Sequence, residues 1–148
     1  MIESPAQYTF AEIKIGTKAK FDMKIDEKMI SEFATFSGDH NPLHVDKNYA
    51  ATTSFRKPIC HGMLLGSFFS RLVGMYLPGK NALYFSQTLN FQAPCFAGDV
   101  ISVEGEVIDK SDATRIITLK TAIYNQQGNC LVDGIAKVIV RDNVQINK

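Results

Sequence analysis

The chain has 148 residues and a formal net charge of +1 at pH 7, with 45% hydrophobic and 21% charged residues. This length fits one domain with a core of its own, so we expect a single domain over residues 1–148. A nearly neutral charge without a run of Lys or Arg gives no electrostatic basis for binding nucleic acid or an anionic membrane.

The first part of the chain predicts one strand followed by helices. Residues 17–25 fit a strand, and apolar residues recur at helical spacing over residues 26–36. Asp26 suits the N-cap of that helix, and Gly38 ends it because glycine tolerates positive φ. The loop over residues 37–44, SGDHNPLH, contains the turn signal Asn-Pro. A short helical segment is expected over residues 46–55.

A long helix and four more strands are predicted in the rest of the chain. The helix covers residues 59–76, and its apolar residues fall nearly all round it, as in a buried helix. Period-two alternation predicts strands at 83–92, 100–108, 115–124 and 130–140, and the last three are joined by short turns. The expected class is α+β, with an antiparallel β-sheet wrapped around a central buried helix.

Asp39 and His44 are the candidate acid–base pair within SGDHNPLH. General acid–base catalysis needs two groups held across one reacting bond, with pKa values near the working pH. Burial can tune an aspartate and a histidine toward that range, and Gly38 and Pro42 restrict the backbone around them. The alternative is a solvated loop whose polar side chains satisfy local backbone donors.

Gly62 and Ser70 are the candidate site residues on the long helix. A glycine in the first helical turn has a free backbone N–H at the positive end of the helix dipole, as an oxyanion hole requires. Ser70 is expected to be buried, where its hydroxyl needs a polar partner across the site. Because Gly62, Gly66, Ser70 and Gly74 recur every four residues, close helix packing is an equally good explanation.

Two segments, FSGDHNPLHVDKNYAATTSF and KPICHGMLLGSFFSRLVG, resemble the MaoC-like hydratase/dehydratase family, most closely its single-domain (R)-specific enoyl-CoA hydratases. The resemblance implies the hot-dog fold and a homodimer. It implies that Asp39 and His44 are catalytic, that Ser70 supports them, and that Gly62 provides the oxyanion hole. The implied reaction is reversible hydration of a trans-2-enoyl-CoA to an (R)-3-hydroxyacyl-CoA, with no metal or other cofactor.

Several alternatives stay open. Metal binding by His40, His44 and His61 is one alternative, but HExxH is absent and Pro42 interrupts the helix that would align them. A thioesterase would direct water at the thioester carbonyl, whereas an Asp/His pair favours hydration. A dehydratase acting on an acyl carrier protein would show a basic patch, for which Arg56, Lys57 and Arg71 are candidates, although CoA phosphates would favour the same residues. The last alternative is a non-catalytic acyl-CoA-binding domain.

Three widely spaced cysteines, Cys60, Cys95 and Cys130, predict reduced thiols and a cytoplasmic compartment. No secretory signal is visible at the N-terminus, and the longest apolar run carries His61 and Arg71, so no membrane span is expected. The acyl chain length would depend on pocket residues such as Leu65, Phe68, Phe69, Val73 and Val138.

Overall fold

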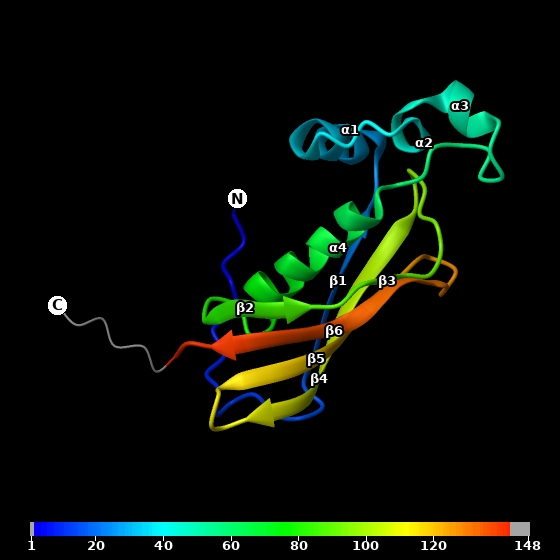
Figure 1. Cartoon of the computed structure of the whole chain (residues 1–148). Helices are drawn as coiled ribbons and strands as arrows, with labels where there is room; N and C mark the ends of the chain where they lie inside the picture. The colour runs from blue at the N-terminus through cyan, green and yellow to red at the C-terminus, as the bar shows by residue number, and fades with distance from the viewer. Residues whose placement is uncertain (1, 143–148) are drawn as a thin grey trace.

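The structure, a computed structural model, describes residues 2–142. Its strands are β1 (Lys18–Lys24), β2 (Ala82–Gln87), β3 (Asn90–Phe91), β4 (Val100–Ser111), β5 (Ile116–Tyr124) and β6 (Cys130–Val140). They form one antiparallel sheet in the order β1-β4-β5-β6-β2, and β3 also pairs with β6, on the edge that β2 occupies (Figure 1). This arrangement confirms the α+β class and the antiparallel sheet expected from the sequence.

The helices form two groups. One group is α1 (Glu27–Ser37), α2 (Pro42–Val45) and α3 (Lys47–Ala51), and the other is α4 (Gly62–Arg71), which continues as the π-helical segment η1 (Leu72–Tyr76). Helix α4 lies along one face of the sheet, whereas α1, α2 and α3 gather beyond the end where α4 begins (Figure 1). The central helix of the prediction is therefore confirmed.

The caps of α1 form as the sequence predicts. The Asp26 carboxylate accepts a hydrogen bond from the Met29 N–H at 2.8 Å, which satisfies a free donor in the first turn. At the other end Gly38 has φ 80°, and its N–H donates to the Ala34 carbonyl. Helix α1 thus ends immediately before Asp39, which fixes where the following loop starts.

Three predicted boundaries are wrong. The loop predicted over residues 37–44 ends at Asn41, because Pro42 suits a first helical turn and the Asn41 side chain caps α2. Helix α4 begins at Gly62, not near residue 59, because the preceding residues run extended and bond elsewhere. The Ile59 N–H donates to the Leu43 carbonyl, and the Cys60 N–H donates to the Cys95 carbonyl. The strand predicted over residues 83–92 is divided into β2 and β3, with an interruption at residues 88–89.

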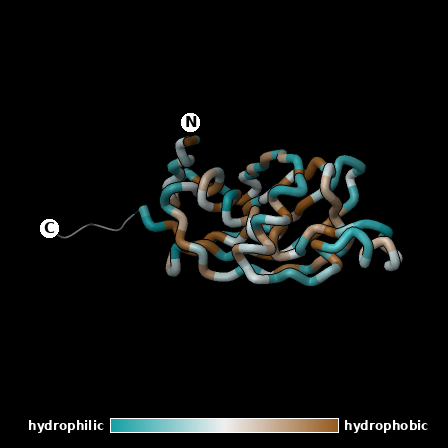
Figure 2. The backbone as a smooth tube through the Cα atoms, turned by 90° about the horizontal axis from the view of Figure 1, so that it is seen from above, coloured by the Kyte–Doolittle hydropathy of each residue, from teal (hydrophilic) through white to brown (hydrophobic). Residues whose placement is uncertain are grey.

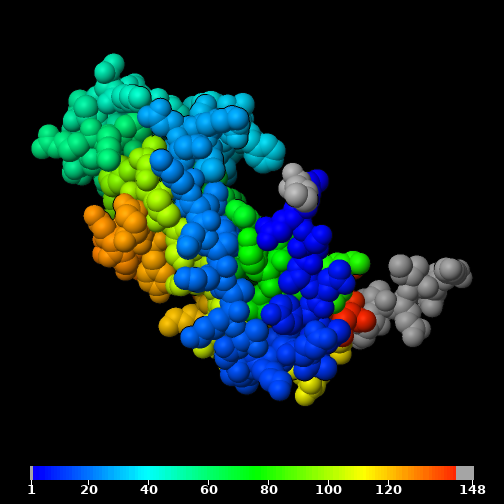
Figure 3. Space-filling model, turned by 180° about the vertical axis from the view of Figure 1, so that it is seen from behind, coloured from blue at the N-terminus to red at the C-terminus, as the bar shows by residue number. Residues whose placement is uncertain are grey.

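The core lies between the sheet and α4–η1. Residues of β4 alternate between buried and more accessible positions over most of the strand. Hydrophobic and hydrophilic stretches both occur along the backbone tube of Figure 2. One buried cluster, including Leu65, Phe69 and Leu131, lies toward the start of α4. A second includes Val73 and Val138. The N-terminal segment lies beside η1, where the Ala6 N–H donates to the Met75 carbonyl (Figure 3).

Candidate active site

Side-chain hydrogen bonds hold the loop that follows α1. The Asp39 N–H donates to the Ser37 hydroxyl, and the Asn41 N–H donates to the Asp39 carboxylate, each at 3.1 Å. The Asn41 side chain then accepts from the Leu43 N–H at 3.0 Å and caps α2. The alternative of a loop whose polar side chains satisfy local backbone donors is therefore partly correct, because the Asp39 carboxylate accepts from the Asn41 N–H. The same bonds orient its exposed carboxylate.

His44 is fixed by a backbone carbonyl of the segment before α4. Its Nδ1 lies 2.7 Å from the Ile59 carbonyl oxygen. A carbonyl can only accept, so Nδ1 carries the proton and donates. This bond is compatible with both the neutral and the cationic ring, which leaves Nε2 as the nitrogen that gains and loses a proton.

His61, which the sequence suggests only as a possible metal ligand, is part of the site. It is 2% exposed, and its ring stacks on that of His44 with the centroids 3.9 Å apart. Its Nε2 lies 3.0 Å from the Asp39 carbonyl, while its buried Nδ1 has no partner among the described residues. Burial lowers the pKa of His61 below its usual value, although the hydrogen bond to Asp39 opposes this effect. The signal in the sequence was a single histidine within an apolar segment.

A cavity of about 440 Å³ brings most of the predicted site together. Asp39, His44, His61 and Gly62 all line it. Gly62 is the first residue of α4, and its N–H has no acceptor among the described residues. A Cβ at Gly62 would lie 2.7 Å from two ring carbons of Phe91, so a side chain at this position would require the Phe91 ring to move.

Ser70 does not join this cavity. The prediction of a buried hydroxyl is wrong, because Ser70 is exposed in the chain as described. It follows Gly62 by eight residues, which is about 12 Å along a helix. Arg71 also lies away from the site: its guanidinium sits 4.3 Å from the centre of the Phe21 ring.

The geometry favours acid–base chemistry over metal binding at these residues. One ligand-type atom from each of Asp39, His44 and His61 lies within 4.8 Å of the others. However, the two imidazole rings are only 28° from parallel. Lone pairs lie in the ring planes, so those of the stacked rings run side by side and do not converge on one ion. His40 is exposed and lies outside this group.

Two thiols form part of the cavity wall. Cys60 and Cys95 are both buried and line the cavity beside His61 and Gly62. A hydrogen bond with the Cys60 thiol, together with burial, raises the pKa of the Cys95 thiol. Leu65 also lines the cavity, whereas Val73 and Val138 are buried in the second cluster.

None of the helices within residues 2–142 combines the length and apolar character needed to cross a membrane.

Comparison with known proteins identifies the family. Residues 10–127 match the model of the MaoC like domain. The chain is 44% identical to the (R)-specific enoyl-CoA hydratase of Aeromonas caviae over 126 residues, covering 85% of this chain and 94% of that protein. It is 30% identical to a mitochondrial 3-hydroxyacyl-[acyl-carrier-protein] dehydratase of Arabidopsis thaliana, covering 86% of this chain and 78% of that protein.

Solved structures agree with this assignment. An R-hydratase of Pseudomonas aeruginosa superposes with a TM-score of 0.87 at 38% identity, covering 95% of this chain and 92% of that one. The sheet wrapped on a central helix is the hot-dog fold that the sequence led us to expect. The chain therefore belongs to the MaoC like domain family, together with the hydratases and dehydratases that it matches.

Proposed function

We propose that this protein catalyses the (R)-specific, reversible hydration of trans-2-enoyl-CoA to (R)-3-hydroxyacyl-CoA. The observation that carries the proposal is the convergence of the Asp39 carboxylate, the His44 ring and the free Gly62 N–H on one cavity. The hydratases among the relatives supply the substrate class and the stereochemistry. Metals, nicotinamides and flavins play no part in the proposed reaction.

The thioester carbonyl is placed against the Gly62 N–H. Donation from this N–H withdraws electron density from the enoyl group, which makes C3 electrophilic. As water adds to C3, negative charge develops on the carbonyl oxygen, and the same N–H at the helix N-terminus stabilises it.

Asp39 and His44 exchange the two protons of the reaction. Asp39 takes a proton from water as the oxygen bonds to C3, and the His44 cation delivers a proton to C2 from Nε2. The proton on Asp39 then returns to His44 Nε2, which restores both groups. The Ile59 carbonyl keeps the ring in place throughout, because it accepts from Nδ1–H in either charge state.

A 3-hydroxyacyl dehydratase acting on an acyl carrier protein is the second proposal, and it rests on the carrier-protein dehydratase among the relatives. The same residues would run that reaction in the opposite direction on a different thioester. A purely acyl-CoA-binding domain is less well supported, since a binding protein needs neither the Asp39 base nor the His44 acid.

We further propose a homodimer in a reducing, cytoplasmic compartment. Support for the dimer comes from the sheet edge formed by β2 and β3, where Leu83, Phe85 and Phe91 are 46%, 63% and 54% exposed. Support for the compartment comes from three free cysteines.

Hydration of crotonyl-CoA by the purified protein tests the proposed function. Loss of the enoyl-thioester absorbance is followed with time, and the 3-hydroxybutyrate released from the product is resolved by chiral chromatography. The proposal expects rapid loss and the (R) product. Activity on a carrier-protein thioester alone would favour the dehydratase, and inactivity on both would contradict an enzymatic role.

A further inference from the structure

A second cavity adjoins the candidate active site through His44. It has a volume of about 510 Å³ and lies between α1, the α2–α3 segment and residues 56–58. His44 lines both cavities, so a ligand reacting at His44 can extend into this one. The reaction proposed above makes no use of the second cavity.

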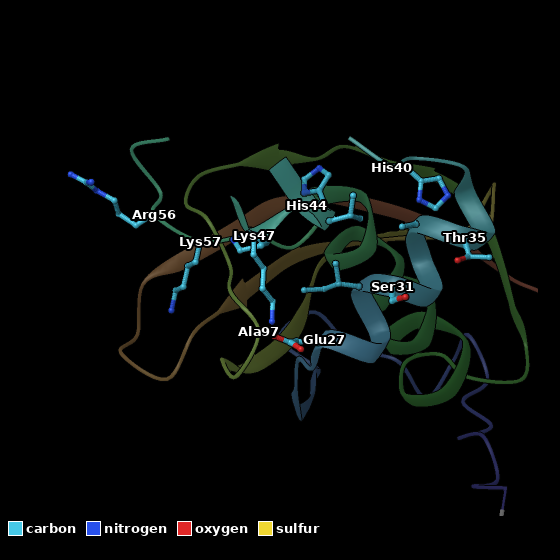
Figure 4. Close-up of a pocket in the computed structure, with 13 residues that line it drawn as sticks. Glu27, Ser31, Thr35, His40, His44, Lys47, Arg56, Lys57 and Ala97 are labelled. Atoms are coloured by element: carbon cyan, nitrogen blue, oxygen red, sulfur yellow. Dashed lines mark ion pairs between the residues drawn. The ribbon is translucent and has the colours of Figure 1, made fainter. Parts of the chain in front are cut away.

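Positive charge gathers at one end of this second cavity. Lys47, Arg56 and Lys57 line it, and Figure 4 shows them on one side of His44, with His40 on the other. Glu27 is the acidic residue in the lining, and its carboxylate lies 3.3 Å from the Lys47 ammonium. Lys57 lies 4.6 Å from the centre of the Phe96 ring. Arg56 and Lys57 form no ion pair with any described residue.

The backbone at Arg56 has an uncommon conformation. Arg56 has φ 68°, in the left-handed region that non-glycine residues adopt infrequently. Residues held in such conformations cluster at ligand-binding sites. Arg56 is exposed, and Figure 4 shows its side chain directed outward from the cavity, away from His44. A guanidinium in this position can bind phosphate oxygens outside the cavity through two parallel N–H groups.

We propose that Arg56 and Lys57, assisted by Lys47, bind the phosphates of the nucleotide part of a CoA thioester. This inference rests on the proposed function, because it assumes a thioester positioned at His44. The remaining lining includes Ile30, Ala34, Val45 and Pro58, which gives the ligand apolar walls beside the charges. CoA carries a pyrophosphate and a 3′-phosphate, whereas a carrier-protein thioester has one phosphodiester. Three cations in one pocket therefore favour CoA.

The test compares crotonyl-CoA with crotonyl-pantetheine, which lacks the nucleotide. The measured quantity is the ratio of kcat/KM for the two substrates, in the wild type, Arg56→Gln, Lys57→Gln and the double variant. Loss of one charge-assisted bond corresponds to about tenfold, so we expect each single variant to lower the ratio about tenfold and the double variant more. Lys28→Gln is the matched control, because it removes an exposed charge from α1 outside the cavity and should keep the wild-type ratio.

Calorimetric binding of adenosine 3′,5′-bisphosphate separates this inference from the proposed reaction, since it needs no turnover. We expect binding to the wild type and at least tenfold weaker binding to the double variant. Equal binding to both proteins, or an unchanged kcat/KM ratio, would overturn the inference. A double variant impaired on crotonyl-carrier protein but not on crotonyl-CoA would also overturn it. If the wild type binds the nucleotide but hydrates no thioester, the proposed function fails and the phosphate site stands.

Discussion

Replacing Gly62 by alanine separates the oxyanion role of its N–H from ordinary helix packing. The new methyl group would lie 2.7 Å from Cδ1 and Cε1 of Phe91. Carbon atoms in contact are normally about 3.5–4.0 Å apart, so the ring has to move by about 1 Å. Phe91 is 54% exposed in the single chain and can turn aside there, so we expect the stability of the monomer to change by no more than about 1 kcal/mol.

The expected effect on catalysis is much larger. The methyl group, or the displaced ring, blocks the approach of a carbonyl oxygen to the Gly62 N–H. Loss of one oxyanion-hole donor lowers kcat by about 10²–10³-fold, equivalent to about 3–4 kcal/mol. The assay is hydration of crotonyl-CoA by Gly62→Ala, with urea unfolding measured in parallel. A kcat within a few-fold of the wild type would refute the oxyanion assignment.

Two further variants isolate the cause. Gly66→Ala is the matched control, because its Cβ would lie 3.0 Å from a Leu89 methyl carbon and it lies one turn beyond the cavity. We expect it to keep nearly wild-type turnover. Adding Phe91→Ala to Gly62→Ala removes the ring. If the methyl group itself blocks the N–H, the double variant stays slow, whereas recovery would assign the loss to the displaced ring.

Three more predictions concern the base, the buried histidine and the sheet edge. Asp39→Asn should lower kcat about 10²–10⁴-fold. Its unfolding midpoint should not change, because the amide oxygen can still accept from the Asn41 N–H. The control Asp22→Asn on β1 should keep full activity, and retained turnover in Asp39→Asn would contradict the base assignment. Burial lowers the folded-state pKa of His61 below its unfolded value of 6.5. The free energy of unfolding is therefore highest above about pH 6.5 and decreases as the pH falls from there through the folded-state pKa, by at most about 1.4 kcal/mol per pH unit. Urea unfolding between about pH 5.5 and 7.5 should show this slope in the wild type and His40→Gln but a flatter one in His61→Gln, and equal slopes would contradict it. Phe85→Lys should convert the proposed dimer to a monomer in light-scattering measurements, and an unaltered mass would place the interface elsewhere.

Local chemistry made much of the fold predictable. The cap at Asp26, the left-handed Gly38 and the alternation along β4 each depend on a few neighbouring residues, and each forms as expected. The start of α4 was missed because it depends on distant partners. The Leu43 and Cys95 carbonyls hold the segment before Gly62 extended, and no local pattern reveals these bonds.

The candidate site was predictable to a similar extent. Asp39 and His44 lie together because they are five residues apart, Asp39 in the loop after α1 and His44 in the α2 that follows, and Gly62 reaches them from the start of α4. Ser70 was misplaced because an apolar pattern nearly all round the helix was read as burial on every side, whereas Met63 and Ser70 are exposed. The role of His61 depends on stacking and on a carbonyl 22 residues away, which only the folded chain brings near.

The paired thiols in the cavity wall bear on which nucleophile adds to the substrate. An enoyl thioester is a Michael acceptor, and a thiolate is a far stronger nucleophile toward it than water. The raised pKa of Cys95, which hydrogen bonds with Cys60, keeps that sulfur protonated in the cavity wall. At Cys95 the protein thereby places a polarisable, close-packing sulfur atom in the wall of the cavity while limiting its alkylation by the proposed substrate.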